Sequence, residues 1–216
     1  MAVIRGINAR IYACDNTAAS TSFTGEATVA NAGRTQFTMT TTSKRFLDPA
    51  HLPVVKLAGT PITSYSSIQY PGARFNWASA LGAGAVTIDG YYFTVATLAQ
   101  CKSWELAAEF DYIDQTCFGD TMRISVPSMR SATVTIQGLA LDDATGGDDR
   151  FLLLKNANLV GLDLFMDATG STEKRYTVYA RPSNVTSTAA VDGIIEQPLS
   201  FTVIDGPYYV AGLGVA

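Results

Sequence analysis

Regular alternation of apolar and polar side chains marks residues 103–114. Successive side chains of a strand point to opposite faces, so this pattern predicts a strand with one buried face and one face that is wet or shared with a partner. A second alternating run covers residues 132–137, and a polar connection with Gly119 and Pro127 separates the two runs. Together they predict a long β-hairpin. The apolar face of the first run is Trp104, Leu106, Ala108, Phe110 and Tyr112, and its polar face carries Ser103, Glu105, Glu109 and Asp111.

Turn residues divide the rest of the chain. Residues 14–33, rich in Thr, Ser, Ala and Gly, predict a loop, and residues 182–193 predict another. The pair Asp89-Gly90 favours a type I′ turn and predicts a compact hairpin over residues 86–95. Further strands are expected at residues 3–13 (as a strand or an extended arm), 34–42, 54–57, 62–70, 73–77, 159–166, 175–180, 199–204 and 208–210, with a turn at 205–207.

The expected elements indicate an all-β chain. Ten to thirteen strands are expected, with one short helix over residues 151–156 capped by Asp148 or Asp149. No β-α unit repeats, so a parallel sheet is disfavoured and an antiparallel β-sandwich or barrel is predicted. No convincing linker appears. We therefore expect one domain over residues 1–216, in which residues 1–97 elaborate the half formed by residues 98–216.

Composition suggests a chain with little exposed charge. Hydrophobic residues make up 47% of the 216 residues and charged residues only 16%. Either much of the surface is hidden in an assembly or the β core is simply well filled. No apolar run reaches 18 residues, so no membrane span is expected, and no membrane is counted among the partners. The start, MAVIRGINARIYA, has no signal-peptide pattern, which predicts synthesis in the cytoplasm.

Charge is distributed unevenly along the chain. The net charge is −4, with +3 over residues 1–100 and −7 over residues 101–216. A protein that grips nucleic acid normally shows a basic stripe, and the second half shows the opposite. Such a surface suits a wall that DNA passes without sticking, although an ordinary acidic surface explains the same numbers. The opposed signs also suit attraction between neighbouring subunits.

Candidate catalytic and metal sites all have a simpler interpretation. His51, the only histidine, lies in a loop sequence without a nucleophile or further ligands nearby. The acids Asp142, Asp143, Asp148 and Asp149 do not match the spacing of an EF-hand and predict a solvated turn. We therefore expect no enzyme activity, no metal and no cofactor. The cysteines, Cys14, Cys101 and Cys117, predict buried free thiols rather than a Cys101–Cys117 bridge.

The hairpin also carries a family resemblance. A tryptophan opens the amphipathic strand, an acidic strand end and D-x-T-x-F-G-D follow, and a basic residue, a proline and a T-V-x-I-x-G strand complete the pattern. Over about residues 98–210, including DDRFLLLKNANLVGLDLFMD, the chain resembles bacteriophage tail tube (major tail) proteins. The residues that carry this resemblance are Trp104, Glu109, Asp111, Asp114, Thr116, Phe118, Gly119, Asp120, Arg123, Pro127 and residues 133–138.

The resemblance implies a structural virion protein with a tail tube type of β-sandwich. Subunits of that family form hexameric rings that stack into a hollow conduit for genome ejection. The implied partners are further copies of the chain, the tape measure, tail tip and terminator proteins, and DNA that passes without specific binding. Segment 41–53 is then expected to be an exposed inter-ring loop. Its contact residues would be Lys44, Arg45, Phe46, Leu47 and Asp48, and the lumen-facing acids would be Glu105, Glu109 and Asp111.

Two other functions remain open at this stage. A capsid decoration or neck protein would use a similar β-sandwich but form trimers or single rings. A carbohydrate-binding module would need an exposed aromatic platform, for which Tyr65, Tyr70 and Trp77 are the candidates.

Overall fold

The chain is all β in the part that the structure describes. This computed structural model describes residues 11–15, 20–94, 96–97, 101–115, 122, 125–138, 159–167, 174–186 and 198–211. Fourteen strands and a single 3₁₀ turn, η2 (Thr42–Lys44), form there, and every strand pair described is antiparallel. The all-β, antiparallel prediction is confirmed. The helix expected at 151–156 and the acidic turn at 142–149 lie outside the described residues.

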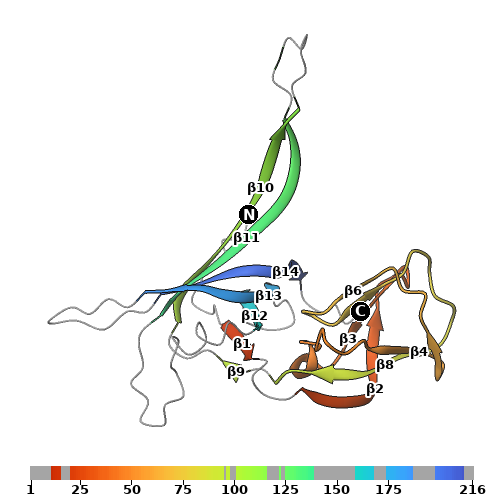
Figure 1. Ribbon diagram of the computed structural model, residues 1–216. Helices are drawn as coiled ribbons and strands as arrows, with labels where there is room; N and C mark the ends of the chain where they lie inside the picture. Colours follow the sequence, from red (N-terminus) through yellow and green to blue (C-terminus); the bar gives the residue numbers. More distant parts are fainter. Residues whose placement is uncertain are drawn as a thin grey trace, which may run out of the picture. The chain divides into compact units, whose positions relative to one another are not determined.

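One seven-stranded sheet contains the predicted hairpin (Figure 1). Its order is β10-β11-β14-β13-β12-β1-β9, so β10 forms one edge. The strands are β1 (Ile11–Asp15), β9 (Ala96–Thr97), β10 (Cys101–Asp114), β11 (Ser125–Gly138), β12 (Val160–Asp167), β13 (Lys174–Val185) and β14 (Leu199–Ala211).

A second seven-stranded sheet is built from residues 21–92. Its order is β5-β4-β8-β2-β3-β7-β6. Its inner face is an apolar core in which Phe37, Phe75 and Ile88 are almost fully buried. The strands are β2 (Thr21–Ala30), β3 (Gln36–Met39), β4 (Val54–Leu57), β5 (Thr60–Ile62), β6 (Ser67–Gln69), β7 (Arg74–Asn76) and β8 (Val86–Tyr92).

The loop predicted over residues 14–33 is wrong for residues 21–30, which form β2. Threonine is β-branched and favours extended backbone, and Phe23 is buried in the core. The glycine that suggested a loop, Gly25, has a φ of 69° and lies where the pairing with β8 shifts register between Phe23 and Glu26. It therefore serves a β-bulge inside a strand.

The compact hairpin predicted at Asp89-Gly90 is also wrong, because β8 continues through both residues. This strand pairs with β4 on one side and β2 on the other. The Asp89 carboxylate accepts a hydrogen bond from the Gly25 amide at 2.7 Å and pairs with Lys56, while Gly90 lies against the Phe23 ring. These cross-strand contacts outweigh the local turn preference.

Two further turn predictions fail for a similar reason. β13 runs to Val185, so the loop predicted over residues 182–193 is wrong for residues 182–185, and β14 runs unbroken through Asp205-Gly206-Pro207. Gly206 has a φ of 110°, and a Cβ there would lie 3.0 Å from the Thr177 carbonyl oxygen. Glycine thus lets β14 pass close to its neighbour without ending.

Contacts group the chain into two compact units. Unit 1 comprises residues 1–99, 157–180 and 204–216, and unit 2 comprises residues 100–156 and 181–203. The strands β13 and β14 each contribute residues to both units. The single-domain organisation with a boundary near residue 97 stays a prediction.

Candidate assembly surfaces

The β10–β11 hairpin has a covered half and an exposed half. Near its base, Val134 and Ile136 of β11 are fully buried, and their partners Leu106 and Trp104 on β10 are half-buried. Farther along the same face, Phe110 is 48% exposed and Tyr112 is 64% exposed. The expected apolar face is therefore present, but the prediction that it is buried along its whole length is wrong. Its outer half lacks a covering layer within the described residues.

Charged side chains accompany this exposed half. Glu105, Glu109 and Asp111 are exposed at odd positions of β10, as the alternation predicted. Arg130, the register partner of Phe110, places its guanidinium 5.2 Å from the centroid of that ring. The face that carries the three acids is solvated here. Their place in a lumen stays a prediction.

The outer edge of β10 is a second unpartnered feature. β10 is 14 residues long and ends the sheet, pairing with β11 alone among the described strands. An edge strand presents unpaired backbone donors and acceptors that invite another strand. Natural proteins usually keep such edges short or cover them, so an edge of this length marks a candidate assembly surface.

The prediction that segment 41–53 is a long exposed loop is wrong at its centre. Phe46 and Leu47 are fully buried, Arg45 and Asp48 nearly so, and Lys44 is half-buried. Phe46 and Leu47 form isolated β-bridges with Pro71 and Tyr92. The Phe46 ring packs edge-on against Tyr179, 5.6 Å between centroids, and the Tyr179 hydroxyl donates to the Leu47 carbonyl at 2.6 Å. The segment thus connects the second sheet with β13 inside unit 1.

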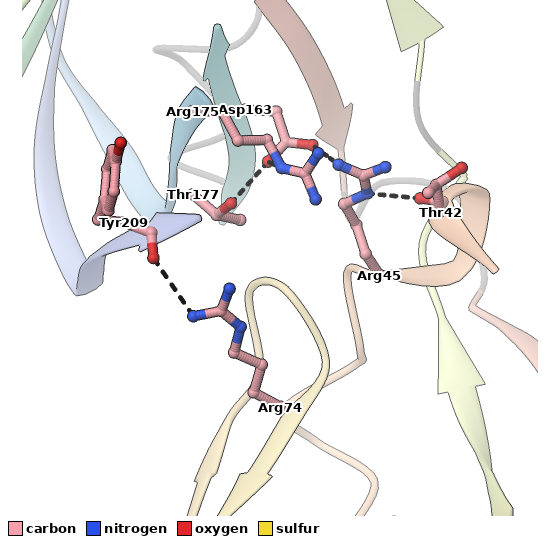
Figure 2. Close-up of polar contacts among 7 residues, drawn as sticks. All are labelled: Thr42, Arg45, Arg74, Asp163, Arg175, Thr177 and Tyr209. Carbon is pink, nitrogen blue, oxygen red and sulfur yellow. Dashed lines mark hydrogen bonds and ion pairs between the residues drawn. The ribbon is translucent and has the colours of Figure 1, made fainter. Parts of the chain in front are cut away.

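An ionic cluster anchors the same segment to β12 and β13 (Figure 2). The Arg45 guanidinium donates to Asp163 Oδ2 at 2.9 Å and to the Thr42 carbonyl at 2.6 Å. Asp163 Oδ1 accepts from the Thr177 hydroxyl at 2.8 Å and lies 3.6 Å from Arg175 Nε. Arg45 is therefore an internal structural residue rather than an exposed contact residue.

Burial sets the electrostatics of this cluster. Asp163 is 1% exposed, and burial raises the pKa of its carboxyl, while Arg45, Arg175 and the Thr177 hydroxyl act in the lowering direction. Two buried guanidinium groups share this one carboxylate. Removing one partner from such a group leaves an uncompensated charge in a low-dielectric interior, so the cluster is a sensitive structural centre.

A third arginine of unit 1, Arg74, has no acidic partner among the residues of Figure 2. Arg74 of β7 donates from Nη1 to the Tyr209 carbonyl of β14 at 3.3 Å. Partial burial lowers the pKa of its guanidinium. In this contact a charged guanidinium donates to a neutral carbonyl, and it adds a further link between the second sheet and β14.

His51 has a structural role in its loop. Its Nδ1 lies 2.8 Å from Asp48 Oδ2, and its ring stacks on Tyr91 at 4.3 Å. Burial acts to raise the pKa of Asp48, but hydrogen bonds from Ser20, the Ala50 amide and His51 outweigh it and hold that pKa below its ordinary value. Asp48 therefore stays ionised and organises the loop.

The proposed aromatic platform is absent from this surface. Trp77 is 6% exposed and packs edge-on against Phe37 and Tyr65, with centroid distances of 5.3 and 6.4 Å. Tyr65 and Tyr70 are half-buried against the same core. These rings belong to the interior of the second sheet, which removes the basis for a glycan-binding interpretation at these residues.

The outer face of the second sheet exposes another apolar group. Val54 of β4 pairs with Asp89, two positions from Tyr91 on β8, so Val54 and Tyr91 share the face opposite the core. Leu52, two residues before Val54, is 68% exposed, whereas Val54 and Tyr91 are 45% and 39% exposed. The Lys56–Asp89 ion pair lies beside them. Local alternation identified none of these residues, because the strand β8 was expected to turn at Asp89.

Groups of three or more potential metal ligands do not occur among the described residues. In the same part of the chain, no helix is both long enough and apolar enough to span a membrane. Asp142, Asp143, Asp148, Asp149 and Cys117 lie outside the described residues.

The sequence matches no family model and no curated protein. Among solved structures, a chain from the tail of an empty GTA particle with C6 symmetry has a TM-score of 0.41 and 13% identity. That match covers 55% of this chain and 86% of the other. A chain from the virion of a native gene transfer agent (GTA) particle has a TM-score of 0.40 and 13% identity, with 54% and 88% covered. At these values the function has to be inferred from the residues of this chain.

Proposed function

We propose that this chain is a structural subunit of a phage-type tail, and within it a tube subunit that polymerises as stacked hexameric rings. The observation that carries the proposal is the 14-residue edge strand β10, whose outer half exposes apolar residues. Pairing this edge with a strand of a neighbouring copy would satisfy its backbone groups and cover its side chains. A head-to-tail contact of this kind closes into a ring when the rotation between copies allows it.

Acidic residues on the same strand support a conduit role. Glu105, Glu109 and Asp111 are exposed on one face of β10, where a closed ring of such strands would place carboxylates along the wall. A negative wall repels phosphate, so a genome would pass without being held. The setting we propose is a virion tail, reached after synthesis in the host cytoplasm. There the chain would contact tape measure, tail tip and terminator proteins.

Contacts between rings need exposed side chains. The inter-ring role of segment 41–53 falls to its exposed residues, such as His51 and Leu52. Residues 45–48 are buried within unit 1 and cannot reach another ring. This revises the expected contact residues and keeps the segment as a candidate.

Negative-stain electron microscopy of the purified chain at rising concentration tests the proposal. We expect hollow tubes or stacked six-fold rings, both with the chain alone and with a tail-tip complex added to start the polymer. Monomers, trimers or isolated single rings under both conditions would overturn the tube proposal and favour a capsid decoration or neck protein.

A further inference from the structure

Among the residues that the structure describes, we single out two exposed apolar patches, one in each unit. The distal hairpin patch consists of Phe110 and Tyr112 on one face of β10, in unit 2. The second-sheet patch consists of Leu52, Val54 and Tyr91 in unit 1. Each patch lies on extended backbone and contains an aromatic ring, the residue type that most often anchors a protein interface. Apolar patches of this kind mark interaction sites.

We propose that the distal hairpin patch of one copy docks on the second-sheet patch of another copy. This inference rests on the proposed function and identifies the two surfaces that meet. The contact is heterologous, since different patches meet, so a growing polymer keeps one unused patch at each end, of opposite kinds. Such a contact propagates along a polymer instead of ending at a dimer.

Charge decides between this partner and a second hairpin. Arg130 lies on the same face as the distal hairpin patch, with its guanidinium 5.2 Å from the centroid of the Phe110 ring, so two hairpins packed through these patches would bring two like charges close. The second-sheet patch instead adjoins a closed Lys56–Asp89 ion pair, whose charges balance. The charges of the whole units favour the same pairing. Unit 2 holds six Lys or Arg and eleven Asp or Glu, whereas unit 1 holds nine Lys or Arg and eight Asp or Glu.

Cysteine cross-linking between two variants tests this contact. The background carries Cys14→Ser, Cys101→Ser and Cys117→Ser, and one batch adds Tyr112→Cys while a second, tagged for size, adds Val54→Cys. Mixed and oxidised under assembly conditions, the two batches are expected to give a disulfide-linked heterodimer. Ser131→Cys serves as the matched control, because Ser131 is exposed on the opposite face of the same hairpin and should cross-link to Val54→Cys far less.

The outcomes separate this inference from the proposed function. Tubes without the Tyr112–Val54 cross-link, or a cross-link no stronger than the Ser131 control, would overturn the docking while leaving the tube intact. A dominant Tyr112–Tyr112 product would also overturn it, in favour of paired hairpins. The heterodimer without tubes would support the docking and overturn the tube proposal.

A charge variant in the natural sequence provides an independent measurement if the cysteine-free background fails to fold. Tyr112→Asp places a carboxylate in the distal hairpin patch, and we expect it to raise the concentration needed for assembly by roughly tenfold or more. Ser131→Asp adds the same charge to the other face and should leave that concentration nearly unchanged. Equal effects of the two variants would contradict the docking.

Discussion

Two phenylalanines in different regions of this chain show that a regular backbone and a buried side chain are separate properties. Phe46 lies in the irregular segment 41–53 and has no exposed surface, whereas Phe110 lies in the regular strand β10 and is 48% exposed. Strand geometry fixes the face to which a side chain points, but only a packed layer removes that face from water. Within the described residues such a layer covers residues 45–48 and the hairpin base, and stops before Phe110.

The same substitution at these two positions should therefore have different effects. We expect Phe46→Ala to lower the free energy of unfolding by about 3–5 kcal/mol, because it leaves a cavity against Tyr179. Phe110→Ala should change it by less than about 0.5 kcal/mol, because nearly half of this residue's surface is already in water. Urea unfolding of the unassembled chain measures both. Similar losses at the two positions would show that Phe110 is covered within the subunit.

The ionic cluster extends the comparison from apolar to charged groups. Asp163→Asn keeps the size of the side chain but leaves Arg45 and Arg175 without their shared carboxylate. We expect a loss of about 3 kcal/mol in the free energy of unfolding. Asp111→Asn, on the exposed hairpin, is the matched control and should cost almost nothing. A loss below about 1 kcal/mol for Asp163→Asn would mean that solvent reaches the two guanidinium groups.

Lowering the pH tests how much the contacts of Glu26 with segment 41–53 stabilise the fold, and this is the smallest effect we expect. Hydrogen bonds from Lys44 and from the Thr41 hydroxyl, at 2.7 Å, lower the pKa of Glu26 below its ordinary value. A lowered carboxyl pKa contributes stability above the unfolded-state pKa and loses it as pH falls through the folded-state pKa. The parent chain should therefore lose stability between about pH 5 and pH 3 by up to about 1 kcal/mol more than Glu26→Gln. Thermal unfolding across that range measures the difference, and equally steep losses would contradict it.

Sequence alone predicted the regular elements that follow from alternation. The hairpin, the all-β class and the strands near residues 54–57, 159–166 and 175–180 are confirmed. Alternation carries this information because strand side chains point alternately to two faces. The residues of the candidate lumen, Glu105, Glu109 and Asp111, are solvated as expected, although their role in an assembly stays a prediction.

Long-range contacts decided the features that sequence reasoning missed. Asp89-Gly90 and Asp205-Gly206-Pro207 carry strong turn signals, yet both lie inside strands. β8 pairs with β4 and β2 around Asp89-Gly90, and β14 passes close to Thr177 of β13 at Gly206. The basic, proline-flanked segment 41–53 resembled a surface loop. Its burial depends on Asp163 and Tyr179, more than a hundred residues away, and local sequence gives no sign of that contact.

The two tryptophans of the chain fall one in each unit, and this provides natural optical reporters. Trp77 is buried among Phe37 and Tyr65 in unit 1, and Trp104 is half-buried at the hairpin base in unit 2. In Trp104→Phe the remaining emission comes from Trp77 alone, and in Trp77→Phe it comes from Trp104 alone. Comparing the two melting curves would show whether the units unfold together, and the Trp104 signal would follow the hairpin as copies assemble.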